Sequence, residues 1–524
     1  MLKRLILFFI FVGLFLGFLV MGCTSKQEHL PILRVQMKGM PISLDPARAE
    51  DGLALKVLAN VFDGLVQYDG KGQLKNGVAQ SIEISPDHKK YVFTLRPEAK
   101  WSDGKPLIAK DFVLGFRRAL APQTASKLSS SLLVIRGAMA YRMGKSPELP
   151  GVKEQDGKLV IELDRPVSYF LQLMTLGGAL PSRQDVLDAH AGNWPDGTRS
   201  SEAPGVGPYR ITSYQPDQKI ILERNPYYWG HSPAIEKVEF VIVSDDSAGA
   251  NLFNQGKLDI LSSIPSLDFQ KWKKEGKVQT SPFLATYYIG FNCRKPPFDD
   301  RDFRAAVSAV IDREGIVAAL MTDEIPARSW IPPGLEGYLS FSEATKRADQ
   351  QAVAAITKVK ARAPSLPPIA FSFDSGERNA LIAEKIEQDL KQKLGLKLSL
   401  TNQDWKSHIK ALQTDAPPLY RLAWQTPFLD PIFHLQVLMT SHPANFSGCG
   451  SPEYDRKITE IETLSPGPER EKKIKEAQEL ISEKDVFLAP IFHYVQSYAV
   501  SPRVKGFQVN PFSVIRFEEL GALQ

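Results

Sequence analysis

Patterns typical of strands and of helices alternate along the 524-residue chain. Short apolar runs rich in β-branched and aromatic residues predict strands at residues 91–95, 158–163, 219–223, 238–243, 286–291, 369–373 and 396–400. Apolar residues that recur every three or four positions predict helices at residues 109–120, 304–311, 377–394 and 469–482. Mixed elements over this length indicate an α/β architecture. About three structural units are expected for a chain of this length. No long linker or repeat divides the chain, so we expect these units to pack together in one molecule.

The composition is that of an ordinary globular protein. The chain is 43% hydrophobic and 23% charged, with a formal net charge of +5. These proportions exclude a disordered, collagen-like or coiled-coil chain and a disulfide scaffold. A nucleic-acid-binding face would need clustered Lys and Arg, and the sequence has no basic block. We therefore expect no nucleic-acid partner.

The first 23 residues predict export from the cytoplasm. Lys3 and Arg4 precede an uncharged apolar run, residues 5–22, which ends at Cys23. A short basic start followed by an apolar run is typical of a signal peptide. A single membrane-anchoring helix is the alternative, because the run is about long enough to span a bilayer. The residues before Cys23 resemble a bacterial lipobox, which favours a signal peptide at 1–22, lipidation of Cys23 and a lipidated tether at 23–29.

Two further cysteines remain, Cys293 and Cys449. An even pair in an oxidising compartment permits a disulfide. Two unpaired buried thiols are also compatible with the sequence, because separation along the chain says nothing about distance in space. Both alternatives stay open at this point.

No complete motif for catalysis, nucleotide binding or metal binding is present. Gly205-Val206-Gly207 begins like a dinucleotide-binding loop, but Pro208 and Arg210 depart from its pattern. The eight histidines are scattered, and neither H-E-x-x-H nor G-x-S-x-G occurs. We therefore expect that the protein is not an enzyme and has no cofactor and no metal site. A catalytic group assembled from distant positions would escape a motif search.

Several segments together carry one resemblance. They are Leu44-Asp45-Pro46, residues 61–66, residues 95–106 with Trp101-Ser102-Asp103-Gly104, residues 111–113, residues 205–209, residues 223–229 with Asn225-Pro226-Tyr227-Tyr228-Trp229, residues 255–259, residues 295–300 with 304–306, and residues 451–455. These segments resemble one family, the solute-binding proteins of the peptide/nickel type (family 5). They follow the family's order and cover nearly everything after the predicted signal. The oligopeptide binders of ABC importers are the branch most similar to this chain.

The resemblance implies a periplasmic-binding-protein-like α/β fold of type 2, a large Venus-flytrap clamp with three lobes. Lobe I would comprise residues 30–62, 187–284 and 496–524, lobe II residues 63–186, and lobe III residues 285–495. The tryptophan- and tyrosine-rich motifs are interpreted as scaffold, because their turn residues and large aromatic side chains suit tight turns and a core.

The resemblance also implies a ligand site. In oligopeptide binders the ligand lies extended, with its main chain bonded by protein backbone. Five positions of this chain match the family's pocket residues: Glu50, Asn251, Trp405, Arg421 and Trp424. Arg421 is expected to be the main cation for a ligand carboxylate.

Other pocket positions depart from the family. Pro427 stands where the family has the aspartate that accepts the ligand's amino terminus. Leu128, Met321 and Asn379 replace a tyrosine, a lysine and a histidine, and Ala285 and Gln425 replace two cysteines that pair in the oligopeptide-binding branch. Asp430 could substitute for the missing aspartate, but Asp followed by Pro431 is a favoured helix start, so the capping role is preferred.

The sequence thus predicts a substrate-binding lipoprotein of an ABC importer, specific for peptides or peptide-like solutes such as cell-wall fragments. It would be a monomer, held by its lipid in the periplasm or on the outer face of a bacterial membrane, and would deliver its ligand to permease subunits. The alternatives are a binder of a chelated metal or another small solute and, from a different class, an extracytoplasmic hydrolase.

Overall fold

The computed structural model describes residues 32–126 and 128–524. The predicted signal peptide, the tether and Cys23 lie outside these residues. In this part of the chain, no helix has the length and apolarity needed to cross a membrane.

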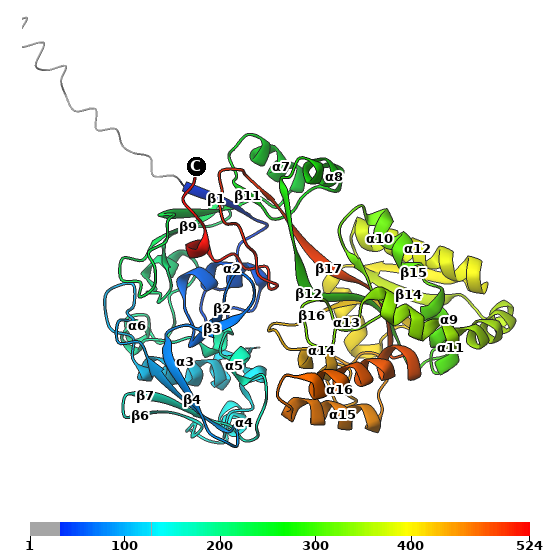
Figure 1. The fold of residues 1–524 in the computed structure, drawn as a ribbon, viewed down its shortest axis with the longest axis horizontal. Coiled ribbons are helices and arrows are strands. Elements are labelled where there is room, and N and C mark those ends of the chain that lie inside the picture. Colours follow the sequence, from blue (N-terminus) through cyan, green and yellow to red (C-terminus); the bar gives the residue numbers. More distant parts are fainter. Residues whose placement is uncertain (1–31, 127) are drawn as a thin grey trace, which may run out of the picture.

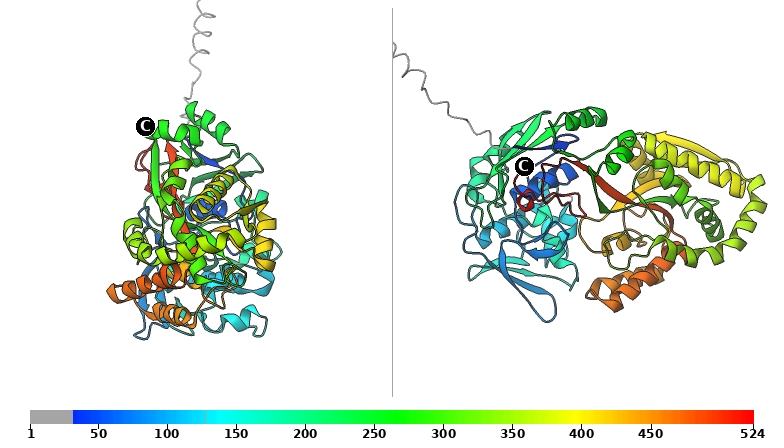
Figure 2. Two further views of the ribbon diagram at one scale, coloured as in Figure 1. Left: turned by 90° about the vertical axis from the view of Figure 1, so that its right-hand side faces the viewer. Right: turned by 45° about the horizontal axis from the view of Figure 1, so that its top comes forward.

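The molecule consists of two bodies connected by two long strands (Figure 1). Strands β12 (Val278–Phe291) and β17 (Leu488–Val500) run antiparallel from one body to the other. We call residues 32–126, 128–277 and 501–524 the first body, and residues 292–487 the second body. A view from another direction also separates the two bodies on either side of these strands (Figure 2, right).

One eleven-stranded sheet runs through both bodies, in the order β15-β14-β16-β12-β17-β11-β1-β10-β9-β8, with β13 (Ile325–Pro326) paired to β17. The strands of the first body are β1 (Ile32–Met37), β8 (Tyr209–Gln215), β9 (Lys219–Arg224), β10 (Lys237–Ile242) and β11 (Ile260–Leu261). Those of the second body are β14 (Ile369–Asp374), β15 (Leu398–Gln403) and β16 (Leu419–Gln425). Because β17 pairs with β11, the end of the chain returns to the body in which β1 lies.

The first body contains two further sheets. A four-stranded antiparallel sheet has the order β4 (Ala79–Ile84), β5 (Lys90–Leu95), β7 (Lys158–Glu162) and β6 (Val152–Gln155), and a hairpin consists of β2 (Val66–Tyr68) and β3 (Leu74–Asn76). The helices of this body are α2 (Gly52–Val61), α3 (Ala109–Leu120), α4 (Ala138–Arg142), α5 (Phe170–Leu173), α6 (Gln184–Ala189), α7 (Asp246–Asn254) and α8 (Ser266–Lys274). Phe112, Phe116 and Leu120 of α3 are wholly buried, as the apolar stripe predicts.

The family motifs of the first body bond to one another. The indole Nε1 of Trp101 donates to Asp111 at 3.0 Å. Asp63 accepts from the Tyr228 hydroxyl at 2.9 Å and from the Trp229 indole at 3.0 Å. All three hydrogen bonds are buried or part-buried, and the two to Asp63 join segments 165 and 166 residues apart in sequence, which agrees with a scaffold role.

The second body has helices on both faces of its part of the sheet. They are α9 (Arg301–Val310), α10 (Arg313–Leu320), α11 (Phe341–Arg362), α12 (Glu377–Leu394), α13 (Trp405–Asp415), α14 (Ile432–Gln436), α15 (Pro452–Thr463) and α16 (Pro468–Glu479). Phe371, Ile289 and Ile386 belong to the core under α9 to α12, whereas Tyr420 and Ile458 belong to the core that includes α14 to α16. The result is an α/β/α sandwich.

A disulfide links Cys293, just after β12, to Cys449, just before α15, with Cα atoms 5.2 Å apart. It lies within the second body. Ala285 and Gln425, which replace the cysteines of the oligopeptide-binding branch, are direct partners in the β12–β16 ladder. The two pairs of positions are therefore different places in the same body.

Candidate ligand-binding site

The carboxyl ends of three parallel strands meet at one edge of the second body. Strands β14, β15 and β16 are parallel, and Asp374 pairs in register with Gln403. Gln425 at the end of β16 pairs with Ala285, on the part of β12 nearer the first body, whereas Leu419 pairs with Phe291. These strand ends therefore face the first body. In α/β sheets, ligands bind outside the carboxyl ends of the strands.

Arg421 of β16 lies at this edge and is only 8% exposed. Its guanidinium forms an ion pair with Asp374, donates to the Tyr494 hydroxyl at 3.1 Å and lies 4.6 Å from the ring centre of Tyr287. The Nε–H group has no hydrogen-bond partner among the described residues. Arg421 is thus already neutralised by Asp374, and a ligand carboxylate would have to share it. Its predicted role in ligand binding stays a prediction.

Two tryptophans flank the same strand ends. Trp424 lies near the end of β16, and its indole stacks on Phe433 with ring centres 5.4 Å apart. Trp405 begins α13, where Asp404 caps the helix by accepting from the Ser407 amide at 3.0 Å. The Trp405 side chain is 55% exposed, which is unusual for so large an apolar group. It therefore offers an aromatic surface that a ligand could cover.

The remaining two predicted residues lie in the first body. Glu50 precedes α2 and Asn251 lies on α7, and both are exposed. The five predicted positions are therefore divided between the bodies, with Trp405, Arg421 and Trp424 in the second.

The positions that depart from the family have local roles. Met321 is exposed at the end of α10, and its carbonyl accepts from Gln270 of α8 at 3.1 Å. Asn379 is buried in α12 and donates to the Asp374 carbonyl at 3.1 Å. Leu128 begins a 3-10 turn, Leu128–Leu132, in the first body. None of these three side chains can supply a cation.

Sequence reasoning missed Arg378, which lies one residue before Asn379. Its guanidinium pairs with the buried Glu324 and lies over the rings of Phe492 at 5.1 Å and Tyr494 at 5.5 Å. Tyr494 therefore contacts both Arg378 and Arg421. The available signal was its position in the first turn of a helix that follows a predicted strand, since such turns border ligand sites in α/β sheets.

Asp430 is occupied by structural partners. Its carboxylate accepts from the Ile432 amide at 2.9 Å and pairs with Arg470 at 2.6 Å, and Asp430 is only 2% exposed. Burial raises the pKa of Asp430, while the Arg470 charge acts in the opposite direction. Helix α14 begins at Ile432, so Asp430 caps it from one residue further away than the Asp–Pro pattern predicts.

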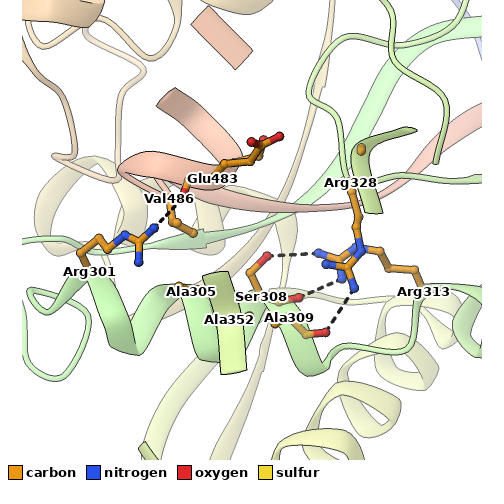
Figure 3. A pocket seen from close by; sticks show the side chains of 11 residues that line it. Arg301, Ala305, Ser308, Ala309, Arg313, Arg328, Ala352, Glu483 and Val486 are labelled. Carbon is orange, nitrogen blue, oxygen red and sulfur yellow. Dashed lines mark hydrogen bonds between the residues drawn. The ribbon is translucent and has the colours of Figure 1, made fainter. Parts of the chain in front are cut away.

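Two hollows in the structure lie away from these residues. A cavity of about 30 Å³ in the second body borders α9 and α11, and Figure 3 shows the arginines around it, with Arg313 bonded to Ser308. Such a volume holds about one or two waters, not a peptide. An open hollow of about 600 Å³ on the first body is lined by Pro97, Glu98, Lys100, Pro226, Tyr227 and Tyr228.

The described residues contain no group of three His, Cys, Asp or Glu side chains placed to hold a metal ion.

Comparisons with known proteins agree on one family. The family description "Bacterial extracellular solute-binding proteins, family 5 Middle" matches residues 73–446. The periplasmic murein peptide-binding protein MppA of Escherichia coli K12 is 30% identical over 500 residues, which cover 93% of this chain and 92% of MppA.

Solved structures give the same result. The unliganded open form of MppA superimposes with a TM-score of 0.81 at 29% identity, covering 95% of this chain and 98% of that one. Haemophilus influenzae OppA in complex with the peptide RPPGFSPFR gives a TM-score of 0.77 at 27% identity, covering 95% of this chain and all of the other. The predicted periplasmic-binding-protein-like fold is confirmed. The chain therefore belongs to family 5 of the bacterial extracellular solute-binding proteins.

Proposed function

We propose that this protein is the substrate-binding lipoprotein of an ABC importer for peptides or peptide-like solutes, with murein-derived peptides as the first class to test. The observation that carries the proposal is the divided site. Trp405, Arg421 and Trp424 lie at strand ends that face the first body, while Glu50 and Asn251 lie on the first body itself. The murein peptide-binding relative, similar over nearly its whole length, supports this ligand class.

The proposed mechanism is closure of the two bodies on the ligand. The chain passes between the bodies through two strands, β12 and β17, so a small change in these strands would rotate one body against the other. Closure would bury the ligand between the three second-body residues and the two first-body residues. A membrane permease would then recognise the closed form, and separate ATPase subunits would supply the energy.

Lipidation of Cys23 is part of this proposal. Nine residue steps separate Cys23 from Ile32, where β1 begins, and a fully extended chain of that length spans about 30 Å. The anchored protein would therefore stay close to the membrane in which the permease lies. Mass spectrometry of the mature amino terminus tests this step, because an acylated Cys23 is expected there and an unmodified or uncleaved terminus would contradict it.

Binding is favoured over hydrolysis by the surroundings of one Thr–His pair. The Thr286 hydroxyl lies 2.9 Å from Nδ1 of His493, an arrangement that can activate a nucleophile. Both side chains are wholly buried, and burial lowers the pKa of His493 to about 3. Because a substrate cannot reach this pair, we interpret it as a structural hydrogen bond and not as a catalytic site.

The ligand retained by the native protein is the decisive measurement. We expect denaturation of the freshly purified protein to release a peptide or a murein fragment, which mass spectrometry would identify. Calorimetry with murein tripeptide should then show one site, which Trp405→Ala weakens and Tyr227→Ala, a change to an exposed tyrosine of the first body, leaves intact. Release of a non-peptide solute, together with no binding of any peptide, would overturn the proposed ligand class.

A further inference from the structure

The segment that follows β16 reaches the first body. Phe428 stacks on Tyr169, with ring centres 5.5 Å apart and planes inclined by 9°. The Leu429 amide donates to the Tyr68 hydroxyl at 3.1 Å. Phe428 is 2% exposed and Tyr169 is 5% exposed, so water is excluded from the contact. The two bodies thus touch here through buried aromatic rings in addition to their two connecting strands.

The same rings continue to the candidate ligand site. Phe428 packs edge-on against Phe433 at 5.9 Å. Phe433 stacks on Trp424 at 5.4 Å with planes inclined by 20°, and its carbonyl accepts from the Trp424 indole at 3.1 Å. Two intervening rings therefore connect Tyr169 of the first body to Trp424 of the second.

Neighbouring polar contacts hold Tyr169 in place. Arg165 pairs with Glu462 of α15, and the Ser168 amide donates to the Glu462 carbonyl at 3.2 Å. Glu462 is 6% exposed and also accepts from Gln436 of α14. The residues just before Tyr169 are thus attached to the second body by an ion pair and a main-chain hydrogen bond.

We infer that Phe428 and Phe433 are positioning residues, which transmit the placement of the first body to the indole of Trp424. The inference rests on the proposed function, because it concerns a ring assigned to the ligand. Aromatic pairs prefer a few geometries, and packed rings move as a unit instead of deforming gradually. Rotation of the bodies must therefore carry Phe428 along with Tyr169 or break their stack, and either event alters the support of Trp424.

This inference also gives Pro427 a role. Its ring fixes the backbone angle φ near −65° immediately before Phe428. The family resemblance places an amine-binding aspartate at this position. In this chain the position lies in the segment after β16, which contacts the first body. The placement of the first body and the orientation of the Trp424 indole are therefore coupled at that segment.

The test uses ligand-free, full-length protein, so its failure is distinct from a failure to bind peptides. Acrylamide quenching of tryptophan fluorescence is measured for wild type, Tyr169→Leu and Tyr169→Phe, each with and without Trp424→Phe, which isolates the Trp424 signal. Tyr169→Leu should raise the quenching of Trp424 about two- to tenfold, the range expected for loss of one aromatic contact. Tyr169→Phe retains the ring and should behave as wild type.

The matched control is Tyr91→Leu. Tyr91 is equally buried and packs on Phe170 at 4.4 Å, but this contact lies within the first body. It should lower stability without changing the Trp424 signal. An unchanged signal in Tyr169→Leu, or an equal change in Tyr91→Leu, overturns the inference. Should Tyr169→Leu not fold, Phe428→Leu interrupts the same contact from the second body and is expected to give the same rise.

Discussion

Replacing Arg470 by methionine tests whether Asp430 is structural or available to a ligand amine. Arg470 is 1% exposed and binds both Asp430, at 2.6 Å, and Glu336. Methionine keeps much of the side-chain volume but leaves the Asp430 charge buried without a cation. Removing one partner of a buried ion pair costs about 3–5 kcal/mol of unfolding free energy. Glu336 is partly exposed and can be rehydrated, so the cost should come mainly from Asp430.

The pH dependence of this loss follows from the pKa of Asp430. Burial already raises this pKa, and Arg470 opposes the rise, so the pKa should increase further in the variant. The folded variant then binds more protons than the unfolded chain between the two pKa values, and the unfolding free energy falls as pH rises through that window. The destabilisation should therefore be largest near neutral pH and should shrink as Asp430 is protonated in acid.

Urea unfolding at about pH 4 and about pH 7 measures both effects. The matched control is Lys475→Met on the same helix, which removes an exposed ion pair with Glu471 four residues away and should cost less than about 0.5 kcal/mol. If Arg470→Met costs no more than this control, or costs the same at both pH values, Asp430 is not a buried charge that depends on Arg470. It would then regain its place as a candidate acceptor for a ligand amine.

Three further predictions concern the site and the disulfide. Trp405→Ala and Trp424→Ala should each weaken binding of the native ligand by roughly 1–3 kcal/mol in calorimetry, and wild-type affinity in both variants would place the site elsewhere. Because Pro427 offers no carboxylate, N-acetylation of a bound peptide should lower its binding affinity by less than about tenfold, or about 1.4 kcal/mol. A larger loss of affinity would show that another carboxylate binds the peptide amine. The double change Cys293→Ser and Cys449→Ser opens a link across 156 residues and should lower the unfolding free energy by about 2–4 kcal/mol, whereas equal urea midpoints for variant and wild type would contradict it.

The local elements of the fold were accessible to sequence reasoning. Helices predicted at residues 109–120 and 377–394 have those bounds in the structure, and the strand predicted at 369–373 ends one residue later. Their apolar stripes and alternation depend on neighbours within a few positions, which the sequence displays directly. The family and its fold followed from motif order.

The connection between the bodies was not accessible in the same way. The strand predicted at 286–291 is only part of the buried end of β12, which continues back to Val278 through a mixture of exposed, half-buried and buried residues. The first part of this strand is held by pairing with β17, more than 200 residues away, and β17 itself was not predicted. Long-range pairing leaves no periodic signal in a half-exposed strand, because neither face is consistently apolar.

The electrostatic state of the site depended on partners that lie far apart in sequence. The resemblance placed Arg421 in the pocket, but it could not show the pairing with Asp374, 47 residues away, or the bond to Tyr494, 73 residues away. A motif match transfers a residue type, whereas its charge balance is decided by side chains that the fold brings together.

That charge balance narrows the kind of ligand the site favours. Arg421 is balanced by Asp374 and Arg378 by Glu324, so these two cations bring no net positive charge to the strand ends. Pro427 occupies the position where the family resemblance places the aspartate that binds a ligand amine. A ligand entering here meets exposed aromatic surface and hydrogen-bond donors that already have charged partners, so its affinity must come mainly from ring contacts and backbone hydrogen bonds. We therefore expect the second-body part of the proposed site to favour solutes whose own charges are balanced or absent over those that carry one strong terminal charge.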